Sequence, residues 1–427
     1  MWRYTMPAEV TRGRFLKGTA AVAVASGMPA FIRSRGEAAD VLRIGLIEEL
    51  TGVSGDIAKR NVYGAQMALD EWNRHGGVMG RRVEFVTEDD RTNPGVAVEK
   101  ARKLINQDRV VALMGAIQSA DSLAVSAAAN SQNIVYVDAG AEADQIVGKD
   151  CHWTTFMTVH NTWDITQATG SAIAQQLGKE RWFFLTPDFA YGHSIVRGYE
   201  EVIKKLGGSV VGNALVPLGT TDFSTYITKI ESAAPNVLVA SIFGANLLNF
   251  VKQARGFGLL AKLPLAGPIL FYEDAWAMAP EDRVGYWGLN WYYKSDLVYS
   301  AKNTLANQFV TDYRARFHEP PADYSCLGYV SADRLLWAID TAKSTDSIKI
   351  ARTLEGAKFH ALWDGETYFS PVNHGLVWPM WFGKLEQHPP ADDPYDVVKV
   401  ISRQPVDPPT AASLARRGQA CSLGWPS

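Results

Sequence analysis

The sequence predicts an α/β protein made of two lobes, each built on a parallel sheet. Short β-rich runs alternate with amphipathic helical segments along most of the chain, which is the pattern of βα units. Two such series follow one another, and 427 residues exceed one ordinary domain. With 47% hydrophobic and 20% charged residues, the composition is that of a globular protein with sizeable cores.

Residues 1–39 have the anatomy of an export signal. Basic residues come first, then an Ala/Val/Gly run, then a small pair before Asp40 (Arg12, Arg14 and Lys17; residues 18–25; Ala38 and Ala39). Residues 11–17 are similar to the twin-arginine motif, with Gly13 in place of the second arginine, so a Sec or an atypical Tat route stays open. No segment has the ~20 apolar residues of a membrane span, so we expect a soluble exported product. A cytoplasmic N-terminal segment is the alternative.

The first βα series begins at Val41. Residues 41–47 are β-rich, and residues 61–75 carry one apolar face that ends at the helix-stopping pair Gly76-Gly77. Further strands are predicted at residues 83–86, 110–114 and 134–137, with helices entered at Pro94 and after Gln118.

The second series has strands at residues 182–185, 209–211 and 237–240, with helices beginning near Tyr191, Phe223 and Ala245. Beyond it we expect a strand at 286–293, helices through Phe309–Phe317 and 330–342 that return to the first lobe, and a β-like segment at 375–385. The Pro- and Asp-rich tail from His388 is predicted to be extended with little secondary structure.

Charge and motifs exclude several functions. A net charge of -3 gives no reason to expect nucleic acid or an anionic membrane as partner. We find no nucleotide-binding glycine motif, nucleophile elbow or His-Glu-x-x-His pattern, so we expect no catalytic residues, no cofactor and no enzyme. Glu88-Asp89-Asp90 are interpreted as loop carboxylates and the cysteine spacing fits no zinc motif, so no metal is expected.

Three loops after predicted strands are candidates for ligand binding, since ligands of open αβ sheets bind at the carboxyl ends of strands, near helix N-termini. They are residues 115–119, 138–142 and 187–192. The first two could hold a carboxylate, and the third offers an aromatic wall.

Several short motifs occur in a consistent order from about Val41 to Leu385: Thr51-Gly52, residues 64–73 with Gly76-Gly77, Asp89-Asp90 before Pro94, Tyr191-Gly192, Asp222-Phe223-Ser224 and Gln253-Ala254-Arg255. In these the chain resembles the branched-chain amino acid (Leu/Ile/Val-binding protein-like) family of ABC transporters. The resemblance implies the type I periplasmic binding fold, with two Rossmann-like lobes of parallel sheets, joined by three crossovers, that close by hinge bending.

On this resemblance the crossovers fall near Thr158, Tyr286 and Trp363. The domain organisation that it implies is a signal peptide at 1–39, lobe 1 at 40–157 plus 287–362, lobe 2 at 158–286 plus 363–400, and a C-terminal tail at 401–427.

Position by position, the resemblance places a ligand carboxylate at Ser119 and a second polar loop at residues 140–142. The expected site residues are Ile57, Gln118, Ser119, Gly140, Ala141, Glu142, Tyr191 and Phe243. In the amino acid binders of this family an acidic residue after Gly-Pro accepts the ligand ammonium. Here Ile269 follows Gly267-Pro268, so that acidic residue is replaced. Unless Glu142 or Asp56 substitutes, a carboxylate, amide or aromatic acid fits better than an α-amino acid, because a buried unpaired ammonium is costly.

A subgroup that shares Trp182–Thr186 has one cysteine before the first crossover and one near the C-terminus. This likeness implies a disulfide between Cys151 and Cys421, with Cys326 free and buried.

The resemblance implies a periplasmic substrate-binding component of an ABC importer. It would act as a monomer, capture a small solute and deliver it to permease and ATPase subunits in the membrane. The alternatives are a ligand-sensing module of the same fold that regulates a receptor or operon, and an αβ enzyme, for which no nucleophile with its base is found.

Overall fold

The computed structural model describes residues 41–52 and 54–426. The predicted signal peptide lies outside these residues. No helix in the described part of the chain is long and apolar enough to cross a membrane.

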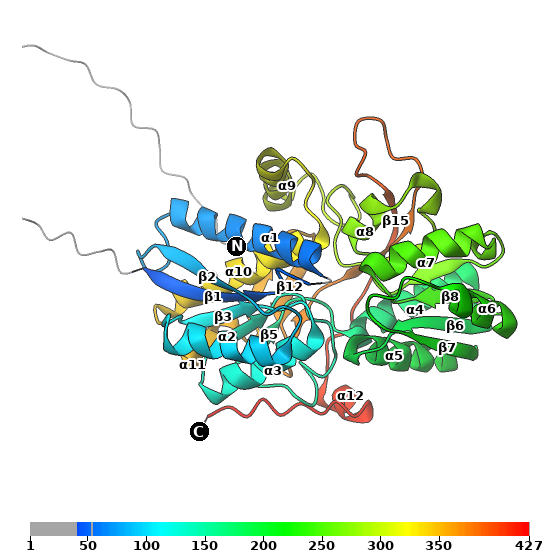
Figure 1. Ribbon diagram of the computed structural model, residues 1–427. Coiled ribbons are helices and arrows are strands. Elements are labelled where there is room, and N and C mark those ends of the chain that lie inside the picture. Colours follow the sequence, from blue (N-terminus) through cyan, green and yellow to red (C-terminus); the bar gives the residue numbers. More distant parts are fainter. Residues whose placement is uncertain (1–40, 53, 427) are drawn as a thin grey trace, which may run out of the picture. The chain divides into compact units, whose positions relative to one another are not determined.

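The first sheet carries the N-terminal βα series (Figure 1). It has five parallel strands in the order β2-β1-β3-β4-β5. The strands are β1 (Leu42–Glu48), β2 (Val83–Asp89), β3 (Ala112–Gly115), β4 (Tyr136–Asp138) and β5 (Thr155–Met157). Its helices are α1 (Gly55–Arg74), α2 (Pro94–Asn106), α3 (Ser119–Ser131), α10 (Asp323–Ala342) and α11 (Ser347–Leu354), of which α1 packs on α10 and α2 on α3.

Glycines allow α1 and α10 to cross at very short range. A Cβ on Gly64 would lie 1.8 Å from the carbonyl oxygen of Ser325, and a Cβ on Gly328 would lie 2.0 Å from that of Asn61. Since both obstacles are backbone atoms, side chains at these positions would push the helices apart. The return of α10 to the first lobe, which the sequence predicts, depends on this contact.

The second sheet has seven strands in the order β15-β14-β10-β9-β8-β6-β7. They are β6 (Trp182–Pro187), β7 (Val210–Val216), β8 (Val237–Ala240), β9 (Leu265–Gly267), β10 (Tyr286–Leu289), β14 (Met380–Leu385) and β15 (Val398–Gln404). The helices that follow this series are α4 (Thr162–Leu177), α5 (Ala190–Leu206), α6 (Ser224–Ala233), α7 (Gly244–Gly256) and α8 (Tyr272–Ala277), with 3-10 turns at Leu259–Ala261 and Pro280–Asp282. The predicted α/β fold with parallel sheets is confirmed, although β14 and β15 join the edge antiparallel.

Two predicted boundaries need correction. Residues 287–289, which were assigned to lobe 1, pair with β9 and β14 of the second sheet. Residues 366–377, which were assigned to lobe 2, contribute to a small antiparallel sheet of β11 (Lys358–His360), β12 (Glu366–Phe369) and β13 (Leu376–Val377), and Gly375 bridges to Met157 of β5. Sheet pairing outweighs sequence position here, because each strand joins the edge that can satisfy its backbone groups. The division into lobes otherwise stays a prediction.

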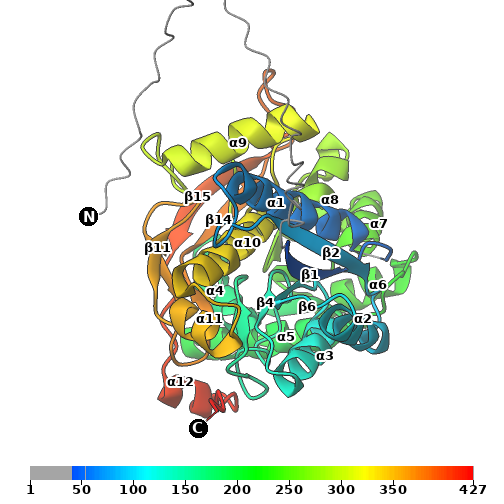
Figure 2. The same cartoon turned by 90° about the vertical axis from the view of Figure 1, so that its left-hand side faces the viewer.

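The tail is more structured than the sequence indicates. β15 crosses the predicted boundary at residue 401, and α12 (Ala411–Arg416) begins with a Thr410 capping box. Figure 2 shows α12 and the C-terminus at the end of the molecule away from α9 (Thr304–Phe317). Because the tail is rich in proline, the sequence does not predict β15, which pairs with the nearby strand β14.

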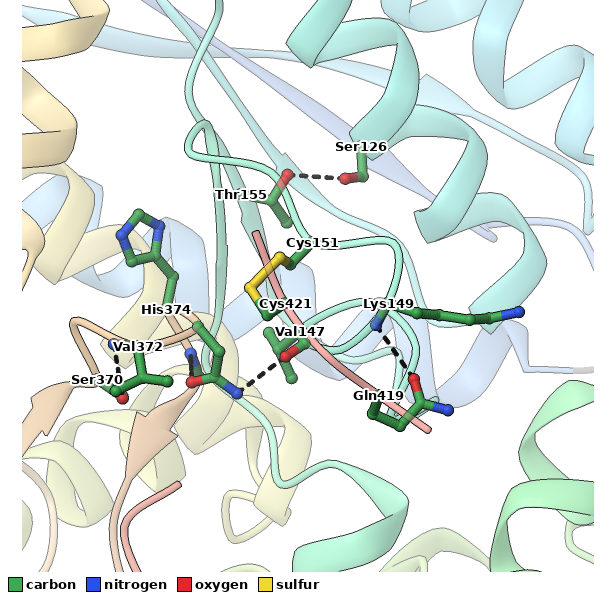
Figure 3. The surroundings of a disulfide bond; sticks show 12 residues. Ser126, Val147, Lys149, Cys151, Thr155, Ser370, Val372, His374, Gln419 and Cys421 are labelled. Atoms are coloured by element: carbon green, nitrogen blue, oxygen red, sulfur yellow. Dashed lines mark hydrogen bonds between the residues drawn. A yellow bond between two sulfur atoms is a disulfide. The ribbon is translucent and has the colours of Figure 1, made fainter. Parts of the chain in front are cut away.

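A disulfide joins Cys151 to Cys421, with Cα atoms 5.7 Å apart (Figure 3). Beside it the Lys149 amide donates to Gln419 Oε1 at 3.2 Å, and the Trp153 amide donates to the Leu423 carbonyl at 2.7 Å. The tail is therefore held to the first lobe by a covalent bond and by flanking hydrogen bonds. Cys326 is buried and unpaired.

Buried carboxyl groups gather at the carboxyl edge of the first sheet. Burial raises the pKa of Asp90 to about 6, and that of Asp121 and Asp138 to about 7, and nearby carboxylates add to the effect at Asp90 and Asp121. Burial also raises the pKa of Glu48 well above its usual range. Each of these groups therefore keeps its proton to a higher pH in the folded protein than in the unfolded chain.

A pH-dependent stability follows. The unfolded carboxyls titrate near pH 4, so the stabilisation from their protonated folded forms is complete below that pH and is lost as pH rises through about 7. We expect a thermal unfolding midpoint several degrees higher at pH 5.5 than at pH 8. Asp121→Asn, which cannot ionise, should reduce the difference in a calorimetric pH series, and an unchanged difference would contradict the assignment.

Candidate functional site

A cavity lies where the carboxyl ends of strands from both sheets face each other. Its volume is about 30 Å³. Its lining comes from the loops after β3, β4, β6, β8 and β9 and from the first turns of α1 and α10: Ser54, Ile57, Ile117, Gln118, Ser119, Gly140, Glu142, Phe189, Tyr191, Phe243, Phe271 and Tyr324. The site thus occupies the position at which open parallel sheets bind ligands.

The structure brings together all but one of the predicted site residues. The exception is Ala141, which is buried but does not line the cavity. The amides of Gly140 and Ala141 donate to Asp138 Oδ1 at 3.0 and 2.8 Å. These two backbone N–H groups are therefore not available to a ligand, and the main polar group that this loop contributes to the cavity is the Glu142 side chain.

The α3 N-terminus is the most suitable anion site in the cavity wall. Gln118 is its N-cap residue but makes no capping bond, because its amide donates to Ser54 Oγ at 3.1 Å. Ser119 is the first residue of the helix and is 3% exposed. Uncapped first-turn N–H groups and the helix dipole favour a carboxylate at this point.

Aromatic rings form the opposite wall. Phe189 and Tyr191 enter α5, Phe243 precedes α7, and Phe271 precedes α8. Phe271 packs against Phe243 with ring centroids 5.3 Å apart, and against Tyr324 of α10 at 5.7 Å. The wall therefore runs from the second lobe onto the first, and a flat apolar ligand would contact both.

Glu142 is the acidic group of the cavity. Burial, together with the nearby Asp323 carboxyl, raises the pKa of Glu142 well above its usual range. Its Oε1 accepts a bond from the Tyr324 hydroxyl at 3.3 Å, and the Asn290 amide also hydrogen-bonds it. No lysine or arginine is among the lining residues. Burial therefore favours the protonated form of Glu142, which can donate a hydrogen bond.

Contacts between the two lobes close the site. Arg60 of α1 pairs with Glu273 of α8 at 3.3 Å, and Ser194 of α5 donates to Asp144 Oδ1 at 3.1 Å. Ile269, which stands where the family's amino acid binders have an acidic residue, is buried and does not line the cavity. Asp56 does not line it either, so Glu142 is the only carboxylate among the lining residues.

Sequence reasoning missed Ser54, Ile117, Phe189, Phe271 and Tyr324. Ile117 and Phe189 lie inside loops that were singled out, and Phe271 follows Gly267-Pro268, so strand-end position could have indicated all three. Ser54 lies before a helix predicted to begin at Asn61, whereas α1 begins at Gly55. Tyr324 carries no local signal, because it reaches the site only through the packing of α10 on α1.

A larger groove lies outside this site. It measures about 850 Å³, is lined from α1 and α9, and contains none of the predicted site residues. Its charges pair across it, as Arg316 does with Asp70 at 2.7 Å. Among the described residues no group of His, Cys, Asp or Glu is arranged to hold a metal ion.

Two α/β lobes with a cavity between the carboxyl ends of their strands define a protein of the type I periplasmic binding class. A family model for periplasmic binding proteins matches residues 41–390, and the chain belongs to this family. It is 25% identical to Leu/Ile/Val-binding protein homolog 7 of Brucella abortus over 334 residues, which are 75% of this chain and 82% of that protein. Homolog 8 of the same organism is 26% identical over 363 residues, which are 82% and 86% of the two chains.

Solved structures have the same fold. A periplasmic binding protein from Burkholderia mallei is 26% identical, with a TM-score of 0.80 over 91% of this chain and 100% of that chain. A Rhodopseudomonas palustris solute-binding protein in complex with benzoate is 21% identical, with a TM-score of 0.75 over 86% and 97%. The second likeness shows the fold alone.

Proposed function

We propose that this chain is the substrate-binding component of an ABC importer, exported to the periplasm. It captures one small solute between its lobes and delivers it to a membrane permease with its ATPase subunits, and it acts as a monomer. The observation that carries this proposal is the cavity between the two sheets, to which both lobes contribute loops at the carboxyl ends of their strands.

The chemistry of the cavity favours a small carboxylate or amide with a flat apolar body. The α3 N-terminus and the Ser119 hydroxyl would hold the anionic or carbonyl end. Tyr191, Phe243 and Phe271 would cover the ring or chain. A protonated Glu142 would donate a hydrogen bond and needs no ligand ammonium. The benzoate complex of the R. palustris protein shows that this fold accommodates such a solute.

Capture without covalent chemistry is proposed because the polar lining groups do not form a catalytic set. Ser119 lies beside no histidine or lysine among the lining residues, so no base is positioned to activate it. The sensor alternative would use the same cavity and would differ in its partner protein.

A thermal-shift screen of residues 40–427 tests the proposal. Amino acids, aliphatic and aromatic carboxylates, amides and urea-like solutes would be compared, because a ligand at about 100 times its Kd adds about 2.7 kcal/mol of stability. We expect a shift with aromatic carboxylates or amides. Tyr191→Ala and Ser119→Ala should weaken binding about tenfold or more.

Phe257→Ala is the matched aromatic control, because Phe257 is 61% exposed and lies outside the cavity. It should leave the shift unchanged. A solute that stabilises the wild type and both cavity variants equally would place its binding elsewhere and contradict the proposal, as would the absence of any stabilising solute.

A further inference from the structure

The chain passes between the lobes at three places that lie side by side. The first is residues 158–161 between β5 and α4, the second begins at Asn290 after β10, and the third is residues 378–379 between β13 and β14. Hinge closure of the proposed kind changes backbone angles at such connections. Side chains that tie the connections together therefore influence the balance between open and closed forms.

His160 makes these ties. It lies on the first connection and is fully buried. Its Nδ1 lies 3.0 Å from Asn290 Oδ1 on the second connection, and its Nε2 lies 3.2 Å from the Trp378 carbonyl oxygen on the third. The ring also stacks on the Trp378 indole, with centroids 4.0 Å apart.

The two partners of His160 make conflicting demands. Both are oxygen acceptors, so each needs an N–H group from the imidazole. Burial lowers the pKa of His160 to about 4, so the ring is neutral at physiological pH and carries one N–H group. One of the two contacts therefore lacks its proton. The Trp378 indole N–H is also buried without a partner, so the hinge does not satisfy all its polar groups at once.

Asn290 connects this hinge to the ligand cavity. Its Nδ2 donates to Asp323 Oδ2 at 3.2 Å and also bonds Glu142, which lines the cavity. These acceptors fix the amide orientation and direct Oδ1 towards His160. A continuous chain of contacts thus runs from Glu142 through Asn290 to His160, although Glu142 and His160 are joined by no direct bond.

We propose that His160 and Asn290 are positioning residues that link solute binding at Glu142 to the open or closed state of the hinge. The link is a proton that His160 carries on either Nδ1 or Nε2. This inference rests on the proposed function. In the closed form the shorter contact to Asn290 selects the Nδ1–H tautomer. In the open form the proton is on Nε2 and is donated to Trp378. One N–H bond is broken as the other forms, the ring stays neutral, and the proton exchanges with water.

Nitrogen NMR of the protein labelled with ¹⁵N-histidine tests the proposal, because the two ring nitrogens report which of them carries the proton. The sequence contains 8 histidines, and the His160 signals are those lost in His160→Gln. Addition of the solute found in the thermal-shift screen should move the His160 proton towards Nδ1. His360, which is exposed and bonded to the Gly365 carbonyl, is the internal control that should not respond.

A double-mutant cycle on solute affinity provides the second measurement. The Kd of the Glu142→Gln/His160→Gln double variant should differ by about threefold or more from the value that the two single substitutions predict together. Residues that act independently would give no such difference, because their free-energy effects add. Solute binding with an unchanged His160 tautomer and additive effects would overturn the link and leave the proposed function standing. A wild-type chain that binds no solute would overturn both.

Discussion

Loss of the disulfide between Cys151 and Cys421 is expected to lower the free energy of unfolding by about 2–5 kcal/mol. The bond joins residues 270 apart in sequence, so its removal frees a large part of the unfolded chain. In the folded state the tail would still be held by hydrogen bonds and by ring contacts, of which Trp153–Trp425 at 5.3 Å lies near the lost bond. Urea unfolding of the Cys151→Ser/Cys421→Ser double variant, at matched pH, measures the loss.

Cys326→Ala provides the control, because it removes the free thiol and keeps the bond. It should shift the unfolding midpoint much less than the double variant. Limited proteolysis should release fragments beyond β15 only in the double variant. Three free thiols in mass spectra of protein from the periplasm, or equal stability of oxidised and reduced protein, would contradict the pairing.

Replacement of Gly64 by alanine should cost about 3 kcal/mol of stability, at the upper end of overpacking effects. The new Cβ would overlap the Ser325 carbonyl oxygen, which is a backbone atom and cannot rotate away. Relief requires separation of α1 from α10, which would also displace Tyr324 from the cavity. The variant should therefore lose both stability and solute affinity, as measured by urea unfolding and titration.

Gly256→Ala is the matched control for this substitution. Gly256 is also helical, and a Cβ there would meet nothing within 4 Å. Alanine at this position should be neutral or stabilising by about 0.5–1 kcal/mol, because glycine is a poor helix former. If the two variants were equally stable, the close crossing of α1 and α10 would not be a determinant of the fold.

Most of the fold and most of the cavity could be predicted from the sequence, because both depend on local order. Strand and helix alternation predicts β1–β4 and β6–β8 and their parallel pairing, whereas the short strands β5 and β9 carry too weak a pattern to be predicted. The alternation also places the loops that carry Ser119, Glu142 and Tyr191 at one edge of each sheet. The resemblance to a known family then selected residues within those loops.

The remaining features depend on contacts between distant segments. The antiparallel pairing of β14 with β10 and the bridge from Gly375 to Met157 join residues that no local pattern relates. Tyr324 reaches the cavity by helix packing alone. The resemblance places Ala141 at the site together with the rest of its loop, but its amide is directed to Asp138.

Solute capture by closure of the two lobes is tested most directly by small-angle X-ray scattering. Residues 40–427 would be measured with and without the solute that gives the largest thermal shift, beside Tyr191→Ala. A decrease in the radius of gyration on solute addition, reduced or absent in the variant at the same solute concentration, is the predicted result. Solute binding that leaves the scattering curve of the wild type unchanged would contradict capture by closure.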